Sequence, residues 1–266
     1  MKRVLIIALL PVLLLTSCKG REISESDAES IKTKIKEEMS TVKNQDIIMK
    51  SSSTRRDDDG KNVSSDLTYH LVMNQDGEGM FIMSGTYGNE KYDLSVYKVK
   101  DEEYEEICYI KNYNSDTKEY EEYTYTERDD LSYNTHVTSY TFSFLAPAIV
   151  YSTYSDPTTI DQIDKEIKSD DGTKRTNTLK YYSKNENNLT IEITTKVDGY
   201  KKNEGDEIAI NGSETITYDN LRLKSVVVKS KTNYNNANNL DISVDYHNDE
   251  KIDISLPNGW EKHIAN

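Results

Sequence analysis

Hydrophobic positions recur with a helical spacing near the start of the chain and with an alternating spacing over most of the rest. Four apolar residues would share one face of a helix over about residues 25–43: Ile31, Ile35, Met39 and Val42. The sequence Ser24-Glu25-Ser26-Asp27 precedes them and is typical of a capping box, in which a serine side chain caps the first turn. We therefore predict an amphipathic helix that packs its apolar face against another element.

From Gln45 onward, apolar and polar residues alternate in short runs that turn-forming residues separate, as at Asp76-Gly77. The alternation predicts successive antiparallel strands, at about residues 47–54, 67–73, 80–86, 92–96, 104–113 and 119–127. The same pattern returns after residue 170 and predicts strands near 175–184, 189–198, 213–229, 238–247 and 250–256.

Two helices are expected between these groups of strands. The least polar internal segment, 142–151, carries Pro147 where it suits the first turn of a short buried helix. A second helix is expected at 158–168, with Thr158 or Thr159 as its N-cap. Its apolar stripe would consist of Ile160, Ile163 and Ile167.

This order of elements predicts an α+β fold. No Pro-, Ser- or Gly-rich linker divides residues 25–266, so we expect one domain there. The expected architecture is a single curved antiparallel sheet, an unclosed barrel, with the N-terminal helix and a helical insert on its concave side.

The first residues predict a secretory signal peptide at 1–17. Lys2 and Arg3 precede a largely apolar run at 4–15, which is shorter than the about 20 residues that a membrane-spanning helix needs. The run ends in Leu15-Thr16-Ser17-Cys18, which resembles the lipobox of bacterial lipoproteins. The resemblance implies cleavage before Cys18, a diacylglyceryl group on its sulfur, a lipidated tether at 18–24 and a location on the outer face of the cell membrane. The membrane is then the first expected partner, because two acyl chains anchor a protein stably.

The order of elements after this signal, together with the ending Lys251-Ile252-Asp253-Ile254-Ser255-Leu256-Pro257, resembles the lipoprotein-carrier (LolA-like) fold. The resemblance implies an apolar hollow that accepts a lipid or another apolar ligand. Flexible and aromatic side chains suit such a lining, and the candidates are Met73, Met80, Phe81, Met83, Phe142, Phe144 and Leu145. The alternative for these residues is an ordinary packed core.

Charge argues against nucleic acid as a partner. The chain has 33 basic and 47 acidic residues, a net charge of −14, which repels phosphate backbones. Twelve acidic residues and six tyrosines lie between Asp101 and Asp130. The alternative function is therefore a surface interaction or adhesion module, in which the acidic, Tyr-rich hairpin at 101–133 meets a protein or a glycan.

We expect no enzymatic activity, no cofactor and no metal site. The four histidines are scattered without a metal-binding spacing, and the sequence contains no P-loop and no G-x-S-x-G motif. Cys108 lies in the strand-like run Glu106-Ile107-Cys108-Tyr109-Ile110, where it is predicted to be a small buried hydrophobic residue.

Overall fold

The computed structural model describes residues 19–56, 60–126, 153–169, 172–200, 208–232, 239–246 and 252–264. These residues are mainly antiparallel strands, and α2 (Glu25–Met39) is the α-helix among their named elements. The chain divides into two compact units, which we describe separately. Unit 1 comprises Met1–Thr41 and Tyr154–Val228, and unit 2 comprises Val42–Thr153 and Lys229–Asn266.

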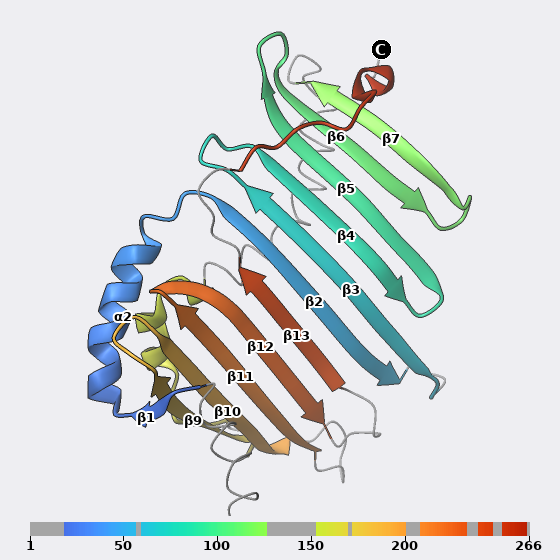
Figure 1. Cartoon of the computed structure of the whole chain (residues 1–266). Helices are drawn as coiled ribbons and strands as arrows, with labels where there is room; N and C mark the ends of the chain where they lie inside the picture. Colours follow the sequence, from blue (N-terminus) through green and yellow to red (C-terminus); the bar gives the residue numbers. More distant parts are fainter. Residues whose placement is uncertain are drawn as a thin grey trace, which may run out of the picture. The chain divides into compact units, whose positions relative to one another are not determined.

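Unit 1 consists of antiparallel strands and the helix α2 (Figure 1). Its strands follow the order β1-β9-β10-β11-β12, and β8 also pairs with β9. Their bounds are Arg21–Ile23 for β1, Glu166–Lys168 for β8, Lys174–Ser183 for β9, Leu189–Tyr200 for β10, Ile208–Asp219 for β11 and Arg222–Thr232 for β12, of which Arg222–Val228 belongs to unit 1. The outer edge of β9 is thus shared by two short strands, β1 at its end and β8 at its start. Residues 21–23 of the expected tether therefore belong to a strand.

The predicted N-terminal helix is confirmed as α2. The Ser24 hydroxyl accepts a hydrogen bond from the Asp27 backbone N–H at 3.1 Å, so Ser24 caps the first turn as expected. The buried face contains Ala28, Ile31, Lys32, Ile35 and Met39. Val42 lies beyond the helix, which ends at Met39 with Ser40 as its C-cap.

α2 packs against β9, β10 and a 3-10 helix, η2 (Pro157–Gln162). Tyr181 of β9 lies opposite Ile191 of β10, and Ile191 lies opposite Ile216 of β11, so these three buried residues share one face of the strands. Lys32 is fully buried in α2, with its Nζ 4.4 Å from the centre of the Tyr181 ring and 3.0 Å from a Glu29 carboxylate oxygen. The ring and the carboxylate together offset the cost of burying the ammonium group.

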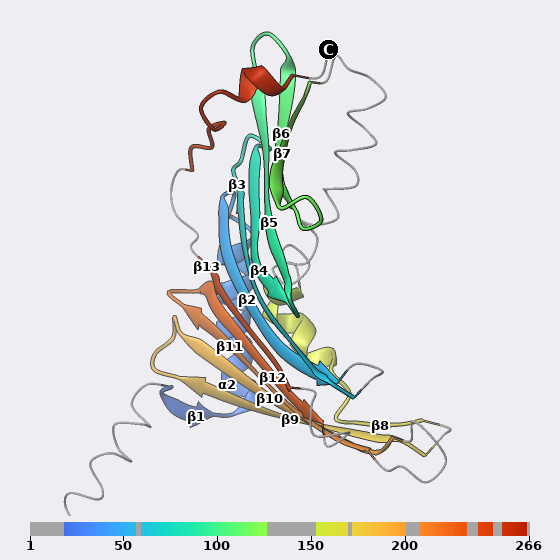
Figure 2. The ribbon, with the colours of Figure 1, turned by 90° about the vertical axis from the view of Figure 1, so that its right-hand side faces the viewer.

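Unit 2 is an antiparallel array in the order β13-β2-β3-β4-β5-β6-β7. The bounds are Gln45–Arg56 for β2, Asn62–Met73 for β3, Gly79–Tyr87 for β4, Glu90–Asp101 for β5, Glu105–Asn114 for β6, Glu119–Thr126 for β7 and Asn239–Tyr246 for β13. Figure 2 shows β2 to β5 nearly edge-on as one layer. The strands predicted from the alternation between Ile47 and Glu127 are confirmed, although most of them are longer than expected.

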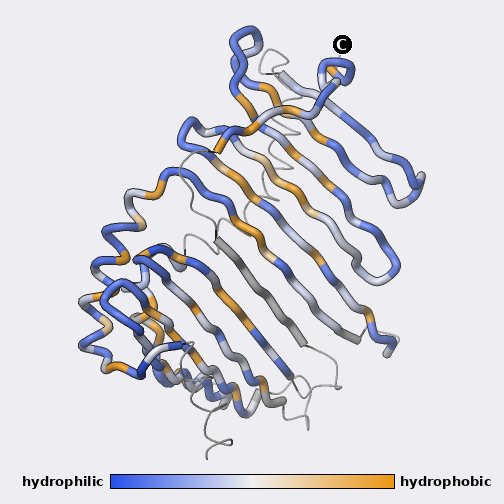
Figure 3. Tube along the Cα trace, viewed as in Figure 1, coloured by the Kyte–Doolittle hydropathy of each residue, from blue (hydrophilic) through white to orange (hydrophobic). Residues whose placement is uncertain are grey.

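The register explains why this alternation was a reliable signal. One row of directly opposed residues crosses five strands and is almost wholly buried: Ile47, Leu71, Phe81, Val96 and Ile110. Figure 3 shows the alternation of apolar and polar positions along the same strands. Because a shift of one residue would turn the whole row to the other face, burial of this row fixes the register.

The C-terminal segment is attached to β7 through a second 3-10 helix, η4 (Trp260–His263). The Thr124 hydroxyl donates to the Trp260 carbonyl at 2.8 Å, and Ile264 forms a parallel bridge with Thr124. His263 Nε2 lies 3.0 Å from a Glu122 carboxylate oxygen. The segment therefore covers part of the β7 edge, which would otherwise offer unpaired backbone groups.

Three predicted elements differ from the structure. The helix expected at 158–168 is wrong: η2 ends at Gln162, and Glu166–Lys168 forms β8. Asp156, not Thr158 or Thr159, caps η2 through a 3.0 Å hydrogen bond from the Thr158 N–H. Only Ile160 is buried at 3% exposure, whereas Ile167 is 39% exposed, because pairing with β9 replaces helical packing.

The strand expected at 213–229 is two strands, because Asn220 and Leu221 adopt positive φ angles of 50° and 64° and form a tight turn between β11 and β12. The strand expected at 250–256 is wrong for the described residues 252–256, which lie outside the strands. These residues alternate between half-buried and exposed but do not pair with another strand. The alternation of the sequence therefore follows their burial and does not indicate a strand. The helix expected at 142–151 lies outside the described residues.

Candidate functional site

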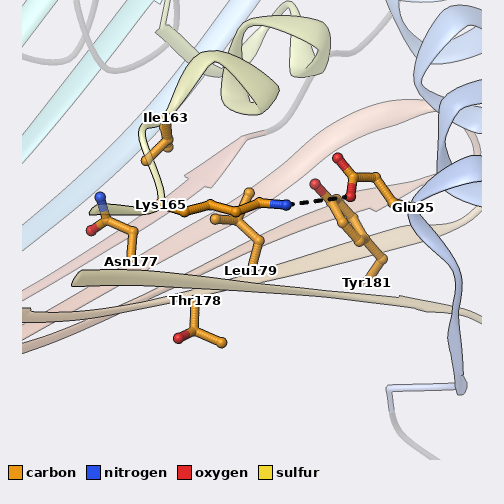
Figure 4. Close-up of a pocket in the computed structure, with 7 residues that line it drawn as sticks. All are labelled: Glu25, Ile163, Lys165, Asn177, Thr178, Leu179 and Tyr181. Atoms are coloured by element: carbon orange, nitrogen blue, oxygen red, sulfur yellow. Dashed lines mark ion pairs between the residues drawn. The ribbon is translucent and has the colours of Figure 1, made fainter. Parts of the chain in front are cut away.

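A pocket of about 300 Å³ opens in unit 1 beside the start of α2 (Figure 4). It is lined by α2, by the segment between η2 and β8, and by β9, through Glu25, Ile163, Lys165, Asn177, Thr178, Leu179 and Tyr181. Its volume is at the lower end of the range for small-molecule sites. We call it the α2 pocket.

The alternation of side chains along β9 determines which of its residues line the α2 pocket. Asn177, Leu179 and Tyr181 lie on one face of the strand, whereas Figure 4 shows Thr178 directed to the other side. Leu179 lies opposite Ile193 of β10, so the floor of the pocket continues into the buried apolar face of the strands. The apolar part of the lining thus comes from Leu179, Ile163 and the Tyr181 ring.

Asn177 holds the segment that forms the opposite wall. This side chain is 4% exposed, and its amide nitrogen donates to the Asp164 carbonyl at 2.7 Å. Its amide oxygen accepts from the Thr195 hydroxyl at 2.9 Å, and its backbone N–H donates to the Lys165 carbonyl at 2.9 Å. Because these bonds occupy its polar groups, Asn177 supports the pocket wall and is not free to bind a ligand.

An ion pair lies at the opening of the α2 pocket. The Lys165 Nζ is 3.9 Å from a Glu25 carboxylate oxygen, and both side chains are mostly exposed. An exposed pair of this kind contributes little to stability, so its charges are available to the polar end of a ligand. Charged groups outside an apolar floor favour an amphipathic molecule.

A second unusual group in unit 1 is Glu214 of β11. It lies opposite Ile193 and faces the apolar side of the strands, where burial raises the pKa of its carboxyl group. Tyr154 is hydrogen-bonded to this carboxyl group, and burial also raises the pKa of the tyrosine. One Glu214 carboxylate oxygen is buried without a hydrogen-bond partner. The sequence signal for this group is a glutamate in phase with the buried Ile216, which the sequence analysis above does not single out.

The structure separates the residues expected to line a hollow. Met73, Phe81 and Met83 share one face of unit 2, whereas Met80 faces the opposite side because it is out of phase with Phe81. Phe81 has no exposed surface, and the three methionines are half-buried. Phe142, Phe144 and Leu145 lie outside the described residues, as does Cys18. The residues of the α2 pocket were not predicted as a site, because its lining comes from three segments that the sequence does not connect.

Cys108 is buried, as predicted, at 1% exposure. Burial is the main reason that its pKa rises to about 12, and the nearby Glu106 carboxylate adds to the effect. A thiol with this pKa is protonated at neutral pH and is a poor nucleophile.

His70 is half-exposed and lies 2.8 Å from the Asp46 carboxylate. Among the described residues, no three His, Cys, Asp or Glu side chains are grouped as metal ligands. Within the part of the chain that the structure describes, no helix is both long enough and apolar enough to span a membrane.

The acidic hairpin predicted around Asn114-Ser115-Asp116 is formed by β6 and β7. Tyr120 and Tyr123 of β7 are 44% and 40% exposed, and they belong to the few large hydrophobic side chains that the described residues expose. The Lys91 Nζ lies 4.5 Å from the Tyr113 ring centre and 5.1 Å from the Tyr120 ring centre. The hairpin therefore presents aromatic rings with charged neighbours to solvent.

Comparison of the chain with protein-family models and with the curated proteins gave no match.

Proposed function

We propose that this protein is a membrane-anchored extracytoplasmic lipoprotein that binds a lipid or another apolar ligand without catalysing a reaction. Support for the anchor comes from the sequence Leu15-Thr16-Ser17-Cys18, which resembles a lipobox. The acyl chains on Cys18 would hold the acidic chain at the outer face of the cell membrane, from which like charge would otherwise repel it.

The α2 pocket is the observation that carries the ligand-binding part of the proposal. It combines an apolar lining, formed by Ile163, Leu179 and Tyr181, with the charges of Lys165 and Glu25 at its opening. An amphipathic ligand would place its apolar part against this lining and its polar end beside the ion pair. We place the ligand here because Phe81, at the centre of the expected hollow, has no exposed surface.

The proposal includes the detailed architecture predicted from the sequence. In this architecture, all strands belong to one curved sheet, and the segment 142–151 is a helix on its concave side. This arrangement would be similar to the lipoprotein-carrier fold, which is the reason for choosing lipids as the first ligand class to test.

Filling the α2 pocket tests the proposal directly. Leu179→Trp adds a large ring to the pocket floor, and we expect the protein to lose at least about 1.4 kcal/mol of affinity, or tenfold, for a fluorescent fatty acid. Thr194→Trp is the matched control, because Thr194 is exposed on the neighbouring strand and out of phase with Ile193, the partner of Leu179. Unchanged fatty-acid affinity in a folded Leu179→Trp protein would rule out this pocket as the ligand site.

A second candidate function is favoured by the exposed Tyr120 and Tyr123. In this alternative, the hairpin of β6 and β7 binds a protein or glycan, and the tyrosines supply contact area at a small entropic cost. Glu119 and Glu121 flank Tyr120 and would set the charge of the partner.

The two functions respond to different substitutions. Replacing Glu119, Tyr120 and Tyr123 together by Gln, Ser and Ser should weaken attachment of whole bacteria to a host or neighbouring surface if the hairpin is the binding site. Fatty-acid binding should stay unchanged in that variant. Loss of fatty-acid binding together with unchanged attachment would contradict the assignment of both sites.

A further inference from the structure

The backbone immediately after Cys18 is held against the fold. Gly20 has a φ of +89°, and a Cβ at this position would lie 2.4 Å from the Ser183 carbonyl carbon and oxygen. The following residues form β1, in which Arg21 pairs with Ser183 and Ile23 with Tyr181. Only glycine permits this close approach and this φ angle, so the chain is fixed from Gly20 onward at the end of β9.

A second pocket, of about 230 Å³, lies at this end of the unit 1 strands. We call it the anchor-proximal pocket. Its wall comes from the N-terminal segment and from the ends and turns of β9 to β12, through Lys19, Tyr182, Lys184, Asn188, Leu189, Thr190, Thr217, Tyr218, Asp219, Lys224 and Ser225. Lys19 is therefore both the residue after Cys18 and part of the pocket wall.

The anchor-proximal pocket is positively charged in an acidic protein. Three lysines and one aspartate line it, whereas the whole chain has a net charge of −14. Lys19 is paired with Glu192 beyond the lining, and the Lys224 Nζ lies 3.6 Å from an Asp219 carboxylate oxygen. Lys184 is exposed and forms no ion pair with another described residue.

Neutral donors accompany these lysines. Thr190, Thr217 and Ser225 also line the pocket, and each of these residues carries a hydroxyl group. Ammonium and hydroxyl groups together are the donors that bind phosphate oxygens. The chemistry of the pocket therefore suits a phosphate monoanion better than a cation or an apolar group.

Covalent geometry places this pocket beside the predicted anchor. Consecutive Cα atoms across a trans peptide are about 3.8 Å apart, and Lys19, which lines the pocket, directly follows Cys18 in the sequence. A diacylglyceryl group on Cys18 has its glycerol at the level of the lipid headgroups. The pocket would then lie at the same level.

We propose, building on the lipid anchor of the proposed function, that the anchor-proximal pocket binds the phosphate of an anionic glycerophospholipid in the membrane that holds Cys18. The anchor supplies a high local concentration of headgroups, and Lys184 and Lys224 supply the charge. Binding turns the β9–β10 and β11–β12 turns of unit 1 toward the membrane. The anchor therefore sets an orientation as well as a location.

Lysine labelling on the full lipidated protein tests this proposal. The lipoprotein is purified from bacterial membranes, its Cys18 peptide is checked by mass spectrometry for acyl groups, and it is reconstituted in phosphatidylcholine vesicles with or without phosphatidylglycerol. We expect Lys184 and Lys224 to react with an amine-specific reagent about fivefold more slowly when phosphatidylglycerol is present. Lys196, an exposed lysine further along β10, should react equally fast in both vesicles.

Substitutions distinguish a specific phosphate site from nonspecific electrostatic attraction to the vesicle surface. Lys184→Gln should remove most of the phosphatidylglycerol-dependent protection of Lys224, whereas Lys196→Gln, with the same loss of charge, should leave it intact. Equal labelling of Lys224 in both vesicles would overturn the proposal. Equal protection by dissolved inorganic phosphate, in vesicles without phosphatidylglycerol, would overturn the assignment to a lipid.

The experiment tests the lipid anchor and the phosphate site independently. A Cys18 peptide without acyl groups overturns the proposed function before any vesicle is made. An acylated protein whose lysines ignore the vesicle composition overturns only the lipid-phosphate site.

Discussion

Single residues determine where backbones can approach each other in this fold. Gly85 of β4 has a φ of +141°, and a Cβ added there would lie 2.0 Å from the Asp66 carbonyl oxygen on β3. Gly77, in the turn before β4, has a φ of +82° and no atom within 4 Å of its added Cβ. Substituting each glycine therefore distinguishes two contributions to stability: the free-energy cost of a close contact and the free-energy cost of a positive φ angle.

We predict that Gly85→Ala lowers the free energy of unfolding by about 3 kcal/mol or more, because β3 and β4 must move apart as well as accept a strained φ. Gly77→Ala, the control, should cost only about 1 kcal/mol. Chemical denaturation measures both values. Equal losses in the two variants would show that the contact with Asp66 does not constrain the strands.

Glu214 is a glutamate that faces the apolar side of the unit 1 strands. Its carboxyl pKa is raised by burial, so the ionised form destabilises the fold once the pH exceeds the pKa of the unfolded chain, about 4.3. One of its oxygens also lacks a hydrogen-bond partner. We predict that Glu214→Gln raises the free energy of unfolding at pH 7 by about 1–3 kcal/mol.

The pH dependence gives the sign of this effect. The advantage of Glu214→Gln should grow as the pH rises from the unfolded pKa through the higher folded pKa, and it should shrink below about pH 4. Glu37→Gln, at an exposed position of α2, should show no such trend. Denaturation curves that give a constant difference between pH 4 and pH 8 would contradict the burial argument.

At the scale of elements, the sequence pattern was most reliable where one face of a strand is buried. The row from Ile47 to Ile110 gave a clear alternation, and the strands of unit 2 followed from it. The pattern gave a wrong prediction at 158–168, where three isoleucines have the spacing of a helix. Glu166–Lys168 instead forms a strand that pairs with the edge of β9. β8 pairs with the next strand along the chain in a short hairpin, and the helical spacing of the isoleucines does not show this pairing.

The element η4 offers a direct measurement, because Trp260 is the only tryptophan in the chain. Hydrogen bonds from Lys111 and then Tyr109 are the main causes that lower the pKa of Glu122, which also contacts His263. A lowered pKa means that the stabilising contact is present above the unfolded pKa, about 4.3, and is lost as the pH falls through the folded value.

We therefore predict that the fluorescence of Trp260 shifts to longer wavelength as the pH falls below about 4, because η4 detaches from β7. Glu122→Gln should cause much of this shift already at pH 7. Glu119→Gln, on an exposed residue of the same strand, should leave the emission unchanged. An identical emission maximum in Glu122→Gln and the unaltered protein at pH 7 would contradict this role of Glu122.

At the scale of the whole molecule, the hypotheses for the location and for the binding site depend on the sequence in different ways. The predicted signal peptide and the lipobox-like sequence are contiguous, so residues 1–18 carry the location hypothesis by themselves. The α2 pocket joins Glu25 to residues 163–181, and no periodic pattern connects segments so far apart. The methionines and Phe81 of unit 2 were predicted to line one hollow, but the strand register places Met80 on the face opposite Phe81.

The central claim is that this protein carries an apolar ligand, and the most direct test is the lipid content of the purified chain. Residues 19–266, exported by bacteria and purified without detergent, are extracted with organic solvent, and the extract is examined by mass spectrometry. The account predicts about one lipid per folded chain, and a marked reduction in Leu179→Trp but not in Thr194→Trp. A folded protein whose extract contains no lipid would contradict it and would direct attention to the hairpin of β6 and β7.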